Sequence, residues 1–193
     1  MYIVRAIAII AVVSLISGCG TVARKVTPEQ TAASSRFYPG KSAVELKSAA
    51  EKALTLLAPD RIRVEVKENE VRARHSYSYI ANRIGYVGST TSFSKVQAQG
   101  ATWYDVTFDE EAGGTRARFT YLNAEPAGMF HPGLKSNLPV TADNNIDDFK
   151  LFHDRLEYLV GLRAAWTLCP GAPVAERQFI ELCDQVGLQN AAP

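Results

Sequence analysis

The stretch EVRARHSYSY, residues 70–79, decides the fold, because its apolar and polar side chains alternate one by one. Val71 and Ala73 fall on one face of an extended strand, and the arginines that flank them fall on the other. Residues 61–67 alternate in the same way, and Glu68-Asn69 forms a short polar turn between the two segments. These segments therefore predict an antiparallel hairpin with one buried face.

A second hairpin is predicted further along the chain. Residues 102–108 and 116–121 alternate like the first pair, and Gly113-Gly114 permits the reversal between them. Residues 80–100, between the hairpins, are rich in Gly, Ser and Thr, which predicts a flexible excursion. Within it, residues 93–99 could add a further strand.

Helices are predicted on both sides of the hairpins. Ser42-Ala43-Val44-Glu45 has the spacing of a capping box, apolar residues follow it at helical intervals, and Pro59 ends the helix. Asn145 is the expected N-cap of a second helix over residues 146–167. A shorter helix is expected over residues 174–186.

This order of elements predicts the fold class. Each strand has one apolar face that needs cover, so helices should pack against a single side of the sheet. We therefore expect one α+β domain over residues 42–193: an antiparallel sheet of four to five strands, with two main helices packed on one face and a short C-terminal helix. Residues 123–145 show no periodicity and are expected to form a long loop, either functional or disordered.

The start of the chain has the layout of an export signal. Residues 1–18 carry one charge, Arg5, followed by an unbroken apolar run over residues 6–13. A transmembrane helix is the less favoured alternative, because crossing a bilayer takes about 20 apolar residues and this run stops near Ile16. The sequence therefore predicts a signal peptide over residues 1–18.

Ile16-Ser17-Gly18-Cys19 resembles a lipobox, the processing site of bacterial lipoproteins. The resemblance implies that the Cys19 thiol takes a diacylglyceryl group and that the signal is cut before it. It also implies that the new amine is then usually acylated too, with palmitate as an expected chain. By the sorting rule of enterobacteria-like systems, Gly20 then favours the outer membrane over the inner one. Two or three acyl chains would hold the protein firmly to a membrane. We expect residues 19–41 to form a flexible tether, because Thr, Ser and Pro break any sustained period there.

Cys169 and Cys183 remain once Cys19 is acylated. An even remainder in an exported protein predicts a disulfide, worth about 3 kcal/mol on the chain-entropy estimate. Two buried thiols are the alternative, because sequence spacing cannot show geometry.

Charge and motifs limit the function. Without the signal, basic and acidic residues are equal in number, which argues against a nucleic-acid binder. The chain has no serine elbow, zinc-binding helix motif, phosphate loop or paired-cysteine redox motif. We therefore expect no enzyme, no metal and no cofactor. His75 is predicted to be a satisfied core histidine, and His153 is predicted to be exposed because it lies off the helix's apolar stripe.

Two features are candidates for binding. The first is the polar face of the predicted hairpins, which carries a group of arginines: Arg63, Arg72, Arg74, Arg116 and Arg118. Such a face suits an anionic ligand or an acidic protein, and a solvated surface that merely keeps the sheet soluble is the favoured alternative. The second is the long loop, in which Met129, Phe130, Leu134 and Leu138 could dock on a partner or on the membrane, or could pin the loop to its own domain. His131, in the same loop, is the histidine placed for contact with a partner.

The element order over residues 42–167 is similar to that of helix-grip domains in envelope lipoproteins, which include an accessory lipoprotein of the outer-membrane barrel-assembly machine. The leading hypothesis is a non-catalytic, lipid-anchored protein of the cell envelope, facing the periplasm, that binds an envelope protein as an accessory part of a larger assembly. The alternative is a carrier that holds a lipid or small apolar molecule between helix and sheet, lined by aromatic residues: Tyr77, Tyr79, Tyr104, Phe108, Phe119 and Tyr121.

Overall fold

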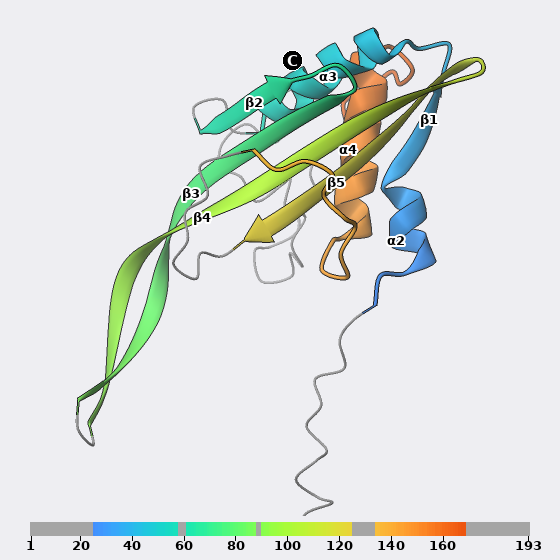
Figure 1. Ribbon diagram of the computed structural model, residues 1–193. Helices are drawn as coiled ribbons and strands as arrows, with labels where there is room; N and C mark the ends of the chain where they lie inside the picture. The colour runs from blue at the N-terminus through green and yellow to red at the C-terminus, as the bar shows by residue number, and fades with distance from the viewer. Residues whose placement is uncertain (1–24, 58–60, 88–89, 125–133, 169–193) are drawn as a thin grey trace, which may run out of the picture.

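The computed structural model describes residues 25–57, 61–87, 90–124 and 134–168. They form the predicted α+β fold, a five-stranded antiparallel sheet in the order β1-β5-β4-β3-β2 with helices packed on one side (Figure 1). The strands are β1 (Ser35–Pro39), β2 (Ile62–Val66), β3 (Glu70–Val87), β4 (Thr90–Glu111) and β5 (Gly114–Ala124). The helices are α2 (Pro28–Ala33), α3 (Ala43–Thr55) and α4 (Ile146–Leu159).

The core lies between the sheet and the two longer helices. Helix α3 packs on β2, β3 and β4, and α4 packs on β5 and β1. At the centre, the ring of Phe119 stacks on that of Phe152 with centroids 3.9 Å apart, and Phe149 meets Phe119 edge-on at 6.1 Å. All three rings are buried. Burial of each such side chain contributes about 2 kcal/mol.

The predicted start of α3 is confirmed. The backbone N–H of Glu45 donates to the Ser42 hydroxyl at 3.3 Å, and the Ser42 N–H donates to the Glu45 carboxylate at 3.0 Å. The hydrogen bonds that the Ser42 N–H and hydroxyl donate to the carboxylate lower the pKa of Glu45, because they stabilise its charged form. The reciprocal contacts satisfy two amides that a helix start leaves without partners.

The tether predicted over residues 19–41 is wrong for its second half. Helix α2 begins at a capping box in which Thr27 and Gln30 exchange hydrogen bonds and Pro28 occupies the first turn. Strand β1 then pairs antiparallel with β5, from Ser35 opposite Arg118 to Pro39 opposite Gly114. The chain therefore joins the folded body at residue 27 rather than at residue 42.

Helix α4 begins as predicted and ends early. The Asn145 side chain accepts from the Asp147 N–H at 3.0 Å, which confirms the N-cap. The prediction that the helix continues to residue 167 is wrong. Gly161 adopts φ 75°, and the Leu162 N–H donates to the carbonyl of Glu157 at 2.8 Å. This left-handed glycine closes a Schellman motif, which stops the helix at Leu159.

The flexible excursion predicted over residues 80–100 is also wrong, although the alternative strand over residues 93–99 is confirmed as part of β4. Strands β3 and β4 continue far beyond their neighbours and pair with each other as far as Val87 opposite Thr90. From Tyr77 opposite Gly100 outward, eleven residue pairs form a two-stranded ribbon, which we call the arm (residues 77–87 and 90–100). The arm extends away from the body of the sheet (Figure 1). At roughly 3.3 Å per residue, it is about 35 Å long.

A glycine lies at the base of the arm. A Cβ atom on Gly100 would lie 2.5 Å from the ring of Tyr77, its cross-strand partner. The aromatic ring therefore covers the position that Gly100 leaves open, a recurrent way of supporting glycine in a strand.

Several predictions lie outside the described residues. These are the signal peptide, the acylated Cys19, the pair Cys169 and Cys183, the helix over residues 174–186, and the loop residues Met129, Phe130 and His131. Within the described ranges, none of the helices combines the length and the apolar character needed to span a bilayer.

Candidate functional site: the outer face of the sheet

The sheet presents one face to α3 and α4 and the other away from them. We call the second the outer face. Successive strand residues point to opposite sides, so Val71 and Ala73 enter the core while Arg72 and Arg74 lie on the outer face. The only described segment that crosses this face is residues 134–140, which we call the strap (Figure 1).

Apolar packing holds the strap to the sheet. Leu138 is buried in a small cluster with Ala101 and Trp103, and Leu122 packs against them. Above the ring of Trp103, the Lys135 ammonium lies 4.5 Å from the centroid, and the Arg74 guanidinium lies 5.9 Å from it. Cations above an indole face are attracted by its negative quadrupole. The indole therefore joins the strap to the arginine face.

Asp105 adds a polar contact beneath the strap. Its buried carboxylate accepts a hydrogen bond from the Leu138 N–H at 3.2 Å. Asn137, with φ 51°, takes the left-handed conformation that turns the strap toward this carboxylate. Burial raises the pKa of Asp105, and the charge of Glu70 raises it further, against the lowering effect of the Leu138 N–H and of Arg72. The surroundings of Asp105 therefore make its charged form less favourable than that of an exposed carboxylate.

The five predicted surface arginines lie on the outer face, but some are paired or half-buried and only some are exposed to solvent. Arg72 pairs with Glu70, and the Arg116 Nε lies 2.6 Å from the Glu111 carboxylate. The Arg116 ion pair raises the pKa of Arg116 and lowers that of Glu111. Arg74 is half-buried against Trp103, while Arg63 and Arg118 are exposed. The exposed cations among the five are therefore Arg63, on β2, and Arg118, on β5.

An open depression of about 500 Å³ lies between the strap and the end of the sheet. Its walls include Asn137 of the strap and the neighbouring strand residues Glu70 and Asp109. Arg118 stands opposite Thr107, which also lines the depression. The surface thus mixes both signs of charge within a shallow hollow, as the polar rims of protein interfaces do.

The described histidines are both buried. His75 lies on the core side, as predicted, but its Nδ1 has no hydrogen-bond partner among the described atoms. The prediction that His153 is exposed is wrong, because α2 and β1 cover that side of α4. His153 Nε2 lies 3.1 Å from the Ser34 carbonyl, and Nδ1 lies 2.7 Å from the Tyr38 hydroxyl. Burial lowers the pKa of each histidine to about 4.

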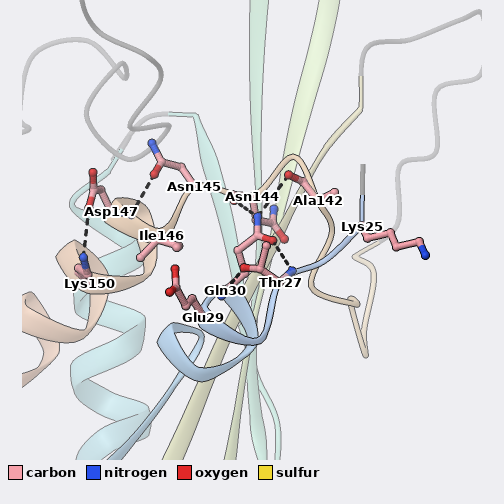
Figure 2. Close-up of a pocket in the computed structure, with 10 residues that line it drawn as sticks. All are labelled: Lys25, Thr27, Glu29, Gln30, Ala142, Asn144, Asn145, Ile146, Asp147 and Lys150. Carbon is pink, nitrogen blue, oxygen red and sulfur yellow. Dashed lines mark hydrogen bonds and ion pairs between the residues drawn. The ribbon is translucent and has the colours of Figure 1, made fainter. Parts of the chain in front are cut away.

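A second depression, of about 600 Å³, lies where α2 meets the start of α4 (Figure 2). Its polar groups are used internally. The Gln30 amide donates to the carbonyls of Ala142 and Asn144, and the Asn144 amide donates to the Tyr121 carbonyl. The Tyr121 hydroxyl in turn donates to Asp148 at 2.7 Å. These contacts fix the point at which the chain enters the fold, and we assign no ligand to this depression.

Sequence reasoning missed Trp103 and Lys135, and although it placed Asp105 on the polar face it did not predict its contact with the strap. The pattern placed Trp103 and Asp105 on the polar side of their strand, and a tryptophan there signals that something covers that side. Only the fold shows that the cover is the strap.

No group of three or more His, Cys, Asp or Glu residues in the described ranges is arranged to hold a metal ion. Comparisons with protein-family models, with curated proteins and with solved structures found no match.

Proposed function

We propose that this chain is a membrane-anchored envelope lipoprotein that acts without catalysis, by binding another protein on the outer face of its sheet. It would serve as an accessory component of a larger envelope assembly, with acyl chains on Cys19 as its anchor. One observation carries the binding part: the outer face has no described helix over it, and it exposes Arg63 and Arg118 on either side of a fixed strap.

The mixture of charges favours a protein partner. Glu70, Asp105 and Asp109 lie among the arginines, so the face has no uniform potential that would concentrate a polyanion. The exposed arginines Arg63 and Arg118 suit carboxylates on a complementary protein surface, because a guanidinium forms paired hydrogen bonds with them.

The buried titratable groups support a role without catalysis. Both ring nitrogens of His153 are engaged by Ser34 and Tyr38 inside the core. Asp105 is engaged by the strap. A general acid or base has to reach its substrate, and these groups face other parts of the same chain.

The aromatic residues considered for a carrier pack against one another. Tyr104, Phe119 and Tyr121 are buried, with the Tyr104 and Phe119 rings stacked at 6.2 Å and the Phe119 and Tyr121 centroids 6.0 Å apart. Phe108 is buried in the same cluster. These rings fill the space between helix and sheet, so no described contact favours the carrier.

The test uses the full chain in intact cells. A photoreactive amino acid in place of Arg63 or Arg118 should trap one protein adduct of the same mass, and the same probe at Lys150 on α4 should not. Arg63→Ser with Arg118→Ser should reduce recovery of that protein about tenfold. Lys52→Ser with Lys150→Ser removes equal charge from the helical side and serves as the matched control.

Two results would contradict the proposal. Equal recovery of the adduct protein with both double variants would exclude the outer face. Mass spectrometry that finds an uncleaved leader, or a free thiol at Cys19, would exclude the lipid anchor independently of the binding result.

A further inference from the structure

The arm has no described contact that explains its length. Along residues 77–87 and 90–100, each strand's sheet partner within the described chain is the other strand alone. A two-stranded ribbon is marginally stable in water, because it has too little apolar surface to bury by itself. A ribbon of eleven pairs outside the core therefore calls for an external surface that supports it.

The arm exposes large apolar side chains. Ile80 is 71% exposed and Phe93 is 77% exposed, more than any other large apolar residue described. Phe93, Lys95 and Gln97 are alternate residues of β4 and point to the same side of the sheet as Trp103, which lies on the outer face. Ile80 of β3 pairs with Gln97 and points to that side as well. An open groove of about 330 Å³ between Ile80 and Lys95 runs along this side.

The charge of the arm is of one sign. Between residues 76 and 101 the sequence has Arg83 and Lys95 and no Asp or Glu. It also has three tyrosines in addition to Phe93, and aromatic rings of this kind favour the interface between membrane and water. The outer face of the body differs, because acidic residues lie among its arginines. Apolar side chains with cations and without carboxylates suit an anionic lipid surface.

The arm and the N-terminal end of the described chain leave from the same end of the sheet. Strand β5 runs from Gly114, at the far end, to Ala124, opposite Ala101 at the base of the arm. Strand β1 begins beside Arg118 and runs toward Gly114, so α2 before it lies toward the arm (Figure 1). Gln30 fixes α2 there, near Tyr121, through Asn144.

The distance to the expected anchor is short. Only residues 20–24 separate Cys19 from Lys25, the first residue described. Fully extended, this stretch reaches about 20 Å, less than the arm's length of about 35 Å. A membrane that holds Cys19 is therefore within reach of the arm, which leaves the sheet at the end toward which α2 lies.

We infer that the arm is a second membrane contact: Ile80 and Phe93 enter the headgroup region of an anionic phospholipid surface, and Lys95 binds its phosphates. This inference rests on the anchoring part of the proposed function and not on the protein-binding part. The acyl chains hold the protein to the bilayer, and the arm sets the orientation in which the outer face is presented to its partner.

The experiment measures vesicle binding by the mature chain, residues 19–193 with Cys19→Ser, which keeps every described element and lacks the acyl group. Flotation with vesicles of phosphatidylcholine and roughly 30% phosphatidylglycerol should recover the protein, and vesicles of phosphatidylcholine alone should recover much less. Ile80→Ser with Phe93→Ser should weaken binding to the anionic vesicles about tenfold or more. Lys95→Glu should weaken it at least about fivefold.

Matched controls lie on the helices. Val44 is 70% exposed on α3, and Lys150 is exposed on α4, so Val44→Ser with Lys150→Glu changes the same side-chain types away from the arm. This control should bind anionic vesicles like the parent chain. Thermal unfolding of each variant shows whether the fold is retained, and the arm substitutions should leave its midpoint unchanged because they lie outside the core.

Binding to anionic vesicles that the arm variants lose and the control keeps is the expected result. Absence of vesicle binding, or equal binding by arm and control variants, would overturn the inference even if Cys19 is acylated. A photoreactive residue at Phe93 that traps a protein in intact cells, without vesicle binding, would likewise overturn it and assign the arm to a protein partner. The state of Cys19, read by mass spectrometry, tests the anchor separately.

Discussion

The Tyr38 hydroxyl donates a hydrogen bond to Nδ1 of His153 over 2.7 Å, and this contact joins the edge strand β1 to helix α4 inside the core. The direction of this hydrogen bond follows from what the other nitrogen of the His153 ring contacts. His153 Nε2 faces the Ser34 carbonyl, which can only accept, so Nε2 carries the proton and Nδ1 accepts. The imidazole is thus neutral and satisfied on both sides, in a place where a charge would be costly.

The first prediction concerns acid. Burial lowers the pKa of His153 from 6.5 to about 4, so protonation favours the unfolded chain. The stabilising contribution is fully present above pH 6.5 and is lost as pH falls through 6.5 toward 4; at full effect it is about 3 kcal/mol. His153→Gln keeps a donor for Ser34 and cannot titrate. It should be less stable than the parent near pH 7 and should approach or exceed it near pH 4.

Urea unfolding at the two pH values measures this difference. His75→Gln is the control, because the pKa of His75 is also lowered to about 4 but its Nδ1 has no partner to lose. It should show the same pH dependence with a smaller cost at neutral pH. A constant gap between His153→Gln and the parent across this range would refute the assignment of a neutral, buried His153.

The second prediction concerns Asp105, whose contribution to stability changes with pH in the opposite direction to that of His153. Burial raises the pKa of Asp105 above its ordinary value of 3.8, because it penalises the charged carboxylate. Its stabilising contribution is present below pH 3.8 and is lost as pH rises through the raised pKa. Asp105→Asn keeps an acceptor for the Leu138 N–H without the buried charge. It should be more stable than the parent at neutral pH, because it removes the cost of burying a charged carboxylate.

This gain should shrink toward zero near pH 3.5, as followed by urea unfolding. Asp109→Asn, on the same strand and exposed, is the control and should change little at either pH. If Asp105→Asn is instead the less stable protein at neutral pH, the charged carboxylate holds the strap better than its surroundings indicate.

The sequence predicted the parts of the fold that depend on local pattern. Alternation at Val71 and Ala73 and at Phe119 and Tyr121 marked the strand faces that enter the core, and the Ser42 capping box marked the start of α3. These signals work because side-chain direction follows from backbone geometry alone. The partner of each strand was less accessible, since pairing depends on residues distant in sequence.

The tether and His153 errors have one cause. With residues 28–39 taken as a linker, one side of α4 had no neighbour, so a polar residue there was expected to meet water. The signal that could have corrected both is Thr27-Pro28-Glu29-Gln30, which has capping-box spacing with a proline in the first turn. A helix of six residues has too few apolar positions to show periodicity, so only its cap identifies it.

The prediction for the arm was wrong for a different reason. Residues 80–100 carry many Gly, Ser and Thr residues, which usually indicate loops. The arm faces no core of its own, so its sequence lacks the regular alternation of apolar and polar residues that marked the other strands. For the outer face, the sequence identified the arginines but not their partners. Arg72 and Arg116 are held by Glu70 and Glu111, and sequence distance alone did not decide which cations remain exposed.

The third prediction concerns the pairing of β1 with β5. A Cβ atom on Gly114 would lie 2.3 Å from the backbone carbonyl oxygen of Tyr38 and 2.9 Å from the Phe37 ring. The backbone atom cannot move without breaking the strand pairing, so Gly114→Ala should cost about 3 kcal/mol. Gly161→Ala is the control: nothing lies within 4 Å of its Cβ, and its cost is the left-handed φ alone, about 1 kcal/mol. Equal losses of unfolding free energy would contradict the close approach.

The last prediction separates a tether from a structural segment by truncation. A chain that begins at Lys25 keeps α2 and β1 and should unfold at the same temperature as the mature chain.

A chain that begins at Lys41 lacks the strand that pairs with β5, the hydroxyl that satisfies His153, and Arg36, whose guanidinium lies 2.8 Å from Asp154 and 3.0 Å from Glu157. It leaves the imidazole buried with an unpaired nitrogen or opens that side of α4 to water, and either outcome is costly. Its midpoint should fall by about 10 °C or more, or the cooperative transition should disappear. Differential scanning calorimetry decides the matter, because a tether can be removed without changing the midpoint, and the edge strand of a sheet cannot.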